Sequence, residues 1–405
     1  MGRVPLTAMP AAQSDKMGND ISNLQPPAPS SAHIASALTI GTIALLVIGV
    51  QPILLGAMVE ARDATLSGVG VIAMCEIVAL GLGVVLSDAF FPISRLRVVG
   101  IAAALLVAAL DGTTTFLTGD ARLAVARSAT GLGEGMLLWL TTCIIVRSRV
   151  PDRVAGIFLV TQALAQAALA AVFASLVIPR VGWRGGFAVL ATVPFLACMA
   201  VAWLPARVTP LAARTFDKFR WSITAALPLE IALLQMAAIG ALWAYLEPLG
   251  KRAGFGPQAA QTLTAGVQVM QVLGGTTASL SVRRLATVPT LAIVGLALGA
   301  IPLAMHGLPA GATLRFALLC AAFGFTWMFL MPFHVSLAFR ADASGRVAML
   351  IPAMQLLGSA LGPLVASFTV TGDDAASVLI VSLTFAAAAV ASLVASNSEL
   401  GGWRA

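Results

Sequence analysis

An arginine and a glutamate lie inside one long apolar segment of this chain, where ionisable side chains could bind a solute or carry protons. Arg127 and Glu134 fall within the run from Ala121 to Val146, which is long enough to span a bilayer. Charges in such a segment usually face a bundle interior or a water-filled cavity, so both residues are candidates for a functional site. Their seven-residue separation corresponds to about 700° of helix rotation and roughly 10 Å along the axis. We therefore expect Arg127 and Glu134 to line one cavity without touching each other; the alternative is that Arg127 snorkels outward or caps a neighbouring helix end.

Two further carboxylates lie in other apolar runs. Glu76 sits at the middle of the run from Leu66 to Leu86, where a carboxylate reaches water only through a cavity. A buried carboxylate is less costly with a proton than as an ion, so Glu76 and Glu134 are the candidates for carrying protons. Glu230 lies nearer the end of the run from Trp221 to Leu246 and could equally be a structural partner for loop arginines.

Glutamines form a polar stripe on one predicted helix. Four of them project at about 0°, 300°, 280° and 220° around the axis, which places them on one side. They are Gln258, Gln261, Gln268 and Gln271. Gln162 and Gln166 share a side in another run. Such amides either contact a bound solute or join helices through hydrogen bonds worth about 0.6 kcal/mol each, and both readings stay open.

The composition indicates a membrane protein. The 405 residues are 59% hydrophobic and 10% charged, against about 25% charged residues in ordinary globular proteins. Apolar runs recur along the chain, which predicts an all-α membrane protein with twelve transmembrane helices. The runs are 34–58, 66–86, 98–116, 121–146, 154–178, 185–204, 221–246, 258–282, 288–305, 314–339, 347–370 and 377–396. The four cysteines fall singly in different runs and the three histidines are scattered, so we expect no disulfide framework, no metal site and no cofactor.

The order of the runs predicts the domains and the orientation. We expect a disordered tail at residues 1–33, a six-helix bundle at 34–204, a linker at 205–220, a second six-helix bundle at 221–396 and a tail at 397–405. Both termini then lie on one side, which carries sixteen of the 24 Lys and Arg residues against seven on the other. Because cytoplasmic loops carry the excess of positive charge, we expect both termini in the cytoplasm. The basic residues are dispersed between the runs, which indicates topology and argues against binding of nucleic acid.

An internal repeat relates the two halves. Sliding the chain by 193 positions superposes Arg122 on Arg315, Gly131 on Gly324, Arg147 on Arg340, Arg153 on Arg346 and Gln162 on Gln355. Duplicated six-helix halves with a site at their interface are typical of secondary transporters. The same shift places Glu134 on Trp327, which lies among phenylalanines. We therefore expect a polar wall from one half to face an aromatic wall from the other, with Trp327 and Gln355 among the site residues.

Three glycine-containing motifs accompany this repeat. The first is Arg127-x-x-x-Gly131-x-Gly133-x-Gly135 in the fourth run. The others are Gly182-Trp183-Arg184-Gly185-Gly186-Phe187, which enters the sixth run, and Gly358-Ser359-Ala360-Leu361-Gly362-Pro363 in the eleventh. With these motifs, residues 34–396 resemble the major facilitator superfamily, whose fourth-helix motif is similar to the first of them. The resemblance implies two pseudo-symmetric six-helix bundles around a central cavity.

The loop after the second run departs from that family's pattern. The family has Gly-x-x-x-Asp-Arg-x-Gly-Arg there, whereas here Asp88 is followed by an apolar stretch and the basic residues come later, at Arg95 and Arg97. The resemblance implies that Asp88, Arg95 and Arg97 belong to a gating loop. The family's antiporter motif places Gly-Pro in the fifth helix, whereas here it lies in the eleventh run, so antiport gains no support.

Together these features predict a secondary transporter that moves a small organic solute by alternating access, powered by protons on Glu76 or Glu134. The solute could be amphipathic, or could carry a carboxylate that Arg127 binds. The alternatives are an efflux pump of the same fold for drugs or metabolites and a membrane sensor that does not transport. The chain has no ATP-binding motif, which disfavours primary active transport. We expect no enzyme, because the three scattered histidines provide neither a metal cluster nor a base for a nucleophile. The expected partners are the solute, protons and the lipids of the inner (plasma) membrane, and the expected state is a monomer.

Overall fold

The computed structural model describes residues 29–205, 208, 222–309, 311–342, 346–372 and 374–395. Most of the expected N-terminal tail and linker, and the whole expected C-terminal tail, lie outside the described residues. Within the described ranges the fold is all-α, and its one extended contact is an isolated bridge between Thr371 and Asp374.

The first half of the chain contains helices α2 to α8. They are α2 (Ser31–Glu60), α3 (Leu66–Phe90), α4 (Leu96–Thr114), α5 (Asp120–Ile145), α6 (Pro151–Val172), α7 (Ile178–Thr192) and α8 (Pro194–Val201), with the short turns η1 (Ile93–Arg95) and η2 (Phe173–Val177). The chain leaves helical geometry at Gly182, where φ is 65°. Glycine tolerates this left-handed conformation, so the chain can turn there between the fifth and the sixth apolar runs.

The second half contains helices α9 to α15. They are α9 (Ile223–Ala244), α10 (Leu246–Arg252), α11 (Pro257–Ser281), α12 (Thr287–His306), α13 (Thr313–Ala341), α14 (Arg346–Ser367) and α15 (Ala376–Ala395). The short helix α10 follows α9 directly after Tyr245, and it leads into the loop before α11.

Helix length and composition account for the predicted number of membrane crossings. Among the described residues, ten helical stretches are long and apolar enough to cross a membrane, and one of them, Arg153–Val201, has 49 residues and holds both the fifth and the sixth runs. The stripe of glutamines keeps α11 out of the ten, but its 25 residues are enough to cross. The twelve crossings form two six-helix bundles, as predicted.

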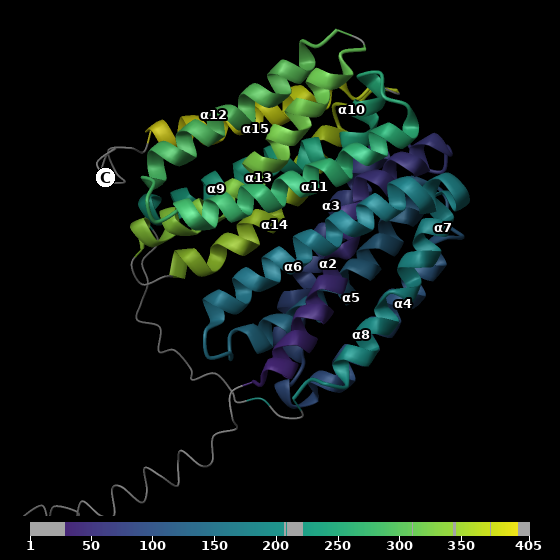
Figure 1. Cartoon of the computed structure of the whole chain (residues 1–405), viewed down its shortest axis with the longest axis vertical. Coiled ribbons are helices and arrows are strands. Elements are labelled where there is room, and N and C mark those ends of the chain that lie inside the picture. Colours follow the sequence, from purple (N-terminus) through teal and green to yellow (C-terminus); the bar gives the residue numbers. More distant parts are fainter. Residues whose placement is uncertain are drawn as a thin grey trace, which may run out of the picture.

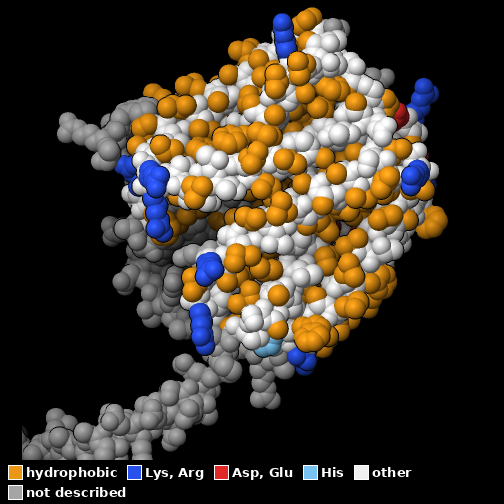
Figure 2. Space-filling model, viewed as in Figure 1, with side chains coloured by type: hydrophobic (Ala, Val, Ile, Leu, Met, Phe, Trp, Pro, Cys, Tyr) orange, Lys and Arg blue, Asp and Glu red, His pale blue; other side chains and the backbone are white. Residues whose placement is uncertain are grey.

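The two bundles lie side by side, with α2–α8 in purple to teal and α9–α15 in green to yellow (Figure 1). We call the end of the molecule where α2 begins the Ser31 end, and the end where α2 finishes the Glu60 end. In Figure 2 the visible face is mostly hydrophobic or uncharged, and its Lys and Arg side chains stand toward opposite margins. This distribution suits a bundle whose middle contacts lipid.

Glycines bring α3 and α5 into close contact. A Cβ on Gly131 would collide with the carbonyl of Glu76, and one on Gly135 with the carbonyl of Leu80. Small residues at this spacing allow the two helix backbones to approach each other. The approach places Glu76 within reach of Arg127, and it therefore positions the site described below.

The two halves contact each other in the part of the molecule toward the Glu60 end. The backbone N–H of Gly70 donates to Tyr245 Oη at 3.1 Å, and Trp243 Nε1 donates to the carbonyl of Ile48 at 3.2 Å. An ion pair of 3.2 Å joins Lys251 to Glu60 at the margin. On the Ser31 side of these contacts the halves enclose a cavity.

Candidate functional site

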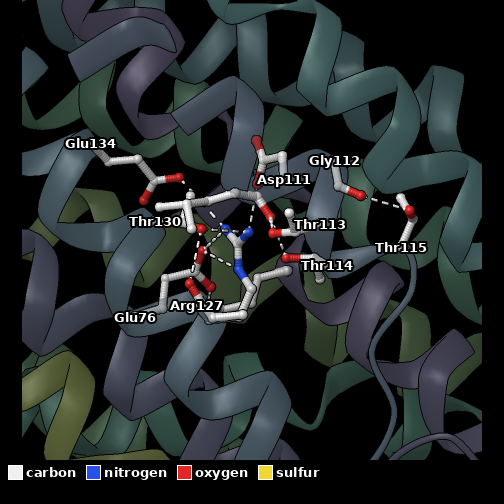
Figure 3. A network of polar contacts seen from close by, with 12 residues as sticks. Glu76, Asp111, Gly112, Thr113, Thr114, Thr115, Arg127, Thr130 and Glu134 are labelled. Carbon is white, nitrogen blue, oxygen red and sulfur yellow. Dashed lines mark hydrogen bonds and ion pairs between the residues drawn. The ribbon is translucent and has the colours of Figure 1, made fainter. Parts of the chain in front are cut away.

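Arg127 lies at the centre of a buried cluster of three carboxylates (Figure 3). Its Nη1 donates to Asp111 Oδ1 at 2.5 Å, and its Nε donates to Glu76 Oε1 at 3.0 Å, an oxygen that Nη2 also contacts. Nη2 is 3.6 Å from Glu134 Oε1, and the guanidinium lies 4.9 Å from the centre of the Phe187 ring. The four charged side chains are 1–5% exposed. Arg127 is therefore held inside the protein and does not snorkel to the membrane surface.

Three helices build this cluster. Glu76 comes from α3, Asp111 from α4, and Arg127 and Glu134 from one face of α5. The expectation that Arg127 and Glu134 do not touch is wrong, because the two side chains form an ion pair. Helical side chains lean toward the N-terminus, so Glu134 points back toward Arg127, and the long arginine side chain covers the remaining distance.

Asp111 is a member of the cluster that was not predicted from the sequence. It lies in the predicted run 98–116, where it is a single carboxylate that follows the apolar stretch ending at Leu110. The rule that identified Glu76 applies to it equally, so the signal was present in the sequence.

The cluster holds more acidic than basic groups. One guanidinium and three carboxylates leave two formal negative charges in excess if every group is ionised. An uncompensated buried ion costs several kcal/mol. Glu134 Oε2 also has no hydrogen-bond partner among the described residues. The cluster therefore has more acidic groups than its single basic side chain can balance.

Gln51 connects the cluster to the cavity between the halves. Its Nε2 donates to Glu76 Oε2 at 3.0 Å, and its side chain, which is 2% exposed, also lines the cavity. Its Oε1 is buried without a hydrogen-bond partner in the described part of the chain. This residue was not predicted from the sequence, although it is a lone glutamine in the first apolar run.

The cavity has a volume of about 270 Å³ and takes side chains from both halves. Its walls come from α2, α3, α5 and α6 on one side and from α9, α11, α13 and α14 on the other. Five of the predicted site residues line it, namely Gln162, Gln166, Gln271, Trp327 and Gln355. Among the described residues that line it, none is Asp, Glu, Lys, Arg or His.

The walls of the cavity differ in part from the expectation. Trp327 does line it and packs edge-on against Trp243, with ring centres 5.2 Å apart and planes at 70°. The ionisable wall expected from Glu134 is absent from the described lining, because α5 turns that face toward α3 and α4. Amides take its place on the first half, from Gln51, Gln162 and Gln166.

The predicted glutamines differ in whether they join helices or line the cavity. Gln268 is buried, donates to the carbonyl of Gly49 and does not line the cavity, so it joins α11 to α2. Gln166 donates to the carbonyl of Leu45 at 2.6 Å and lines the cavity as well. Gln162 and Gln271 line the cavity, and Gln271 Nε2 is buried without a partner among the described residues.

His334 forms a second buried polar group beside the cavity. Its Nε2 lies 2.7 Å from Gln235 Oε1 and its Nδ1 lies 3.1 Å from Gln355 Nε2. With Gln355 donating to Nδ1, Nε2 carries the hydrogen that Gln235 accepts, which is the pattern of a neutral ring. Gln355 therefore connects His334 to the cavity, as Gln51 connects the charge cluster.

The remaining predicted residues lie away from the cluster and the cavity. Glu230 is exposed and accepts a hydrogen bond of 2.8 Å from Ser392 on α15. Asp88 accepts a bond of 3.0 Å from Trp139 Nε1, Arg97 donates to the carbonyl of Leu204 at 2.9 Å, and Arg95 is exposed. The structure therefore brings none of these four residues to the central site.

A buried carboxylate also lies where the halves meet near the Glu60 end. Glu247 of α10 is 0% exposed, forms an ion pair of 2.8 Å with Lys251, and packs against Gly56 of α2 so closely that a Cβ there would overlap its carboxylate. Burial raises the pKa of Glu247 to about 7, although the Lys251 ammonium acts in the opposite direction. Lys251 in turn reaches Glu60 of the first half. This group closes the interface at that end.

Comparison with known proteins places the fold. No protein-family model matches the chain, and a search of curated proteins found no match either. Solved structures do match it over nearly its whole length. A mutant of the nucleoside transporter NupG has a TM-score of 0.72 and 12% identity, with 89% of this chain and 99% of that chain covered.

Two further structures have similar coverage. The xylose transporter XylE from E. coli has a TM-score of 0.63 and 14% identity, covering 90% of this chain and 98% of that chain. A bacterial homologue of the human lysosomal transporter Spinster has a TM-score of 0.60 and 13% identity, covering 92% and 97%. All three are major facilitator transporters, and this chain has the major facilitator superfamily fold.

Proposed function

We propose that the protein is a secondary transporter that moves a small organic solute by alternating access and couples this movement to protons. The observation that carries the proposal is the position of Gln51, which lines the cavity between the halves and also donates to Glu76 of the buried acidic cluster. A solute in the cavity and a proton in the cluster would therefore act on the same hydrogen-bonded chain.

The contacts between the halves support a conformation that is closed at the Glu60 end. Bonds from Gly70 and Trp243, together with Glu247 packed against Gly56, join the halves there. The cavity lining reaches Phe158 and Pro352, close to the Ser31 ends of α6 and α14. The charge count predicts that both termini lie on the cytoplasmic side of the inner membrane. With that orientation the cavity lies toward the cytoplasm, and the conformation is inward-facing.

The acidic cluster supplies a reason for proton coupling. When a carboxyl group of the cluster is ionised, the excess negative charge is attracted to Arg127 and repelled by the other carboxylates. A proton bound or lost there changes the forces between α3, α4 and α5, and Gln51 passes the change to the cavity wall. The cavity and the cluster are both complete within one chain, which supports a working monomer.

The engagement of Arg127 argues against its binding a carboxylate on the solute. Three carboxylates already surround its guanidinium, and it does not line the cavity. An efflux pump with the same cavity differs only in the direction of net movement. A sensor without transport would still bind solute, and it would not accumulate it.

Accumulation by purified protein in proteoliposomes tests the proposal. Vesicles are given a defined mixture of uncharged metabolites with a pH gradient in either direction, and their contents are identified by mass spectrometry. We expect at least one compound to accumulate with the gradient. The Glu76→Gln variant should lose accumulation but keep equilibration of that compound, because a neutral amide cannot bind and release the proton.

The matched control is Glu230→Gln, which makes the same change at an exposed carboxylate outside the site. It should accumulate the compound as the wild type does. Accumulation by Glu76→Gln equal to that of the wild type would refute coupling through Glu76. If no compound enters wild-type vesicles under either gradient, the sensor reading replaces transport.

A further inference from the structure

The chemistry of the cavity lining restricts the kind of molecule that it can hold. We infer that its ligand is an uncharged molecule with a flat apolar part and, beside it, both a hydrogen-bond donor and a hydrogen-bond acceptor, as in an aromatic amide. This inference rests on the proposed function, because it names the class of solute that the same cavity takes.

The absence of charge from the described lining disfavours an ionic ligand. An ion that enters the cavity leaves water without meeting an opposite charge on the wall. Arg127 cannot bind an anionic ligand, because its guanidinium already forms ion pairs with three carboxylates. Those carboxylates cannot bind a cationic ligand directly, because none of them lines the cavity. Gln51 lies between the cavity and Glu76.

Two residues of the lining carry buried, unpaired amide atoms, and we assign the polar part of the ligand to these two side chains. Gln51 Oε1 and Gln271 Nε2 are buried without hydrogen-bond partners in the described part of the chain, and their residues are 2% and 5% exposed. In the Gln51 side chain, Nε2 donates to Glu76 Oε2, and Oε1 is the atom left without a partner. A buried group without a partner carries an unrecovered desolvation cost, which a ligand can remove.

These two atoms require complementary groups on one ligand. Gln51 Oε1 needs a donor, and Gln271 Nε2 needs an acceptor. They come from α2 and α11, that is, from opposite halves of the molecule. A single ligand that satisfies both would therefore join the two halves across the cavity.

The rest of the lining fits an apolar ring. Trp243 and Trp327 lie edge to face, and the indole N–H of Trp243 is already used by the carbonyl of Ile48, so this ring offers the ligand apolar surface. Met236 and Met328 also line the cavity, and methionine adapts to varied apolar shapes. The volume of about 270 Å³ lies just below the roughly 300–1,000 Å³ of typical small-molecule sites, so the ligand is small.

Four probes of nearly the same size and shape test this inference. Benzamide has a donor and an acceptor, acetophenone has only an acceptor, benzoate carries a negative charge, and benzamidinium carries a positive charge. Their binding to the full chain in lipid nanodiscs is measured at pH 7 by saturation-transfer difference NMR, with empty nanodiscs as the background. We expect benzamide to bind about tenfold or more tightly than either ion, and more tightly than acetophenone.

A substitution then locates the binding. Gln271→Leu keeps the approximate size of the side chain and removes its donor, so benzamide should bind about tenfold more weakly. Gln258→Leu makes the same change on the same helix, at an exposed position outside the cavity lining, and should bind benzamide as the wild type does. The comparison of the four probes needs only the wild-type protein, so it remains decisive if Gln271→Leu fails to fold.

The binding results test the class of ligand, and the accumulation assay tests the proposed function. Tightest binding of benzoate or benzamidinium would overturn the uncharged class, and so would a failure of benzamide to bind. Equal binding of benzamide and acetophenone would overturn the paired donor and acceptor. Binding of benzamide without proton-driven accumulation of any solute would leave the inference intact and refute the proposed function instead.

Discussion

The Arg127→Met variant tests the charge cluster, because it removes the cation and keeps much of the side-chain volume. Glu76, Asp111 and Glu134 would then lie together in the protein interior with no basic partner within the cluster. The formal excess would rise from two to three negative charges if all three stayed ionised. We expect a loss of stability that grows with pH, because protons neutralise the carboxylates at low pH.

The expected size of the stability loss follows from the burial of the ion pairs that Arg127 forms. Removing one partner of a buried ion pair costs about 3–5 kcal/mol. At about 2.1 cal/mol/K of unfolding entropy per residue, a chain of 405 residues loses about 4–6 °C of melting temperature from such a change. We expect this loss at pH 8 and a clearly smaller one at pH 5.

A thiol-reactive dye can follow the unfolding of the purified protein. Cys143 and Cys320 are buried in the folded state and become reactive when the helices separate. Arg122→Met provides the control, since it makes the same change at an exposed position of α5. The double variant Arg127→Met with Asp111→Asn should recover part of the loss, because it removes one of the unpaired charges.

An equal loss of stability in Arg127→Met at pH 5 and pH 8, with no recovery in the double variant, would refute the role of the carboxylates. The cost would then come from lost packing against Phe187 and not from the carboxylates. A wild-type melting temperature in Arg127→Met at both pH values would refute any stabilising role for the cluster.

Two further predictions concern the packing between helices. The pKa of Glu247 is about 7 in the closed interface, above its ordinary value of 4.5. The closed state therefore has its full stability below pH 4.5 and loses stability as the pH rises through 7. Hydrogen exchange at the end of α2, compared between the two proteins at each pH, should therefore be faster in the wild type than in Glu247→Gln at pH 8 and similar at pH 4; a constant difference would exclude titration of Glu247. Gly135→Leu should prevent recovery of a monodisperse protein in size-exclusion chromatography, because its side chain would meet the backbone of α3, whereas Gly156→Leu has open space and should behave as the wild type. Normal recovery of Gly135→Leu would show that α3 and α5 tolerate separation.

The sequence by itself determined the class of the protein, the number of crossings and part of the candidate site. Apolar runs of bilayer length, and ionisable residues inside them, are local features that need no knowledge of packing. They identified Glu76, Arg127 and Glu134, all of which belong to the buried cluster. The same local rule would have found Asp111. The repeat also identified Trp327 and Gln355, which both line the cavity.

Only the tertiary structure decided how these residues are combined. Which way a helix face turns depends on its neighbours, so the sequence could not show that Glu134 faces α3 and α4 and not the cavity. It could not show that Arg127 is already occupied, because its partners come from helices far apart in the chain. Gln51 and Gln268 are both glutamines in apolar runs, yet one connects the cavity to the cluster and the other binds the backbone of α2. That difference arises from the distance and rotation between packed helices, which the pattern of a single helix does not contain.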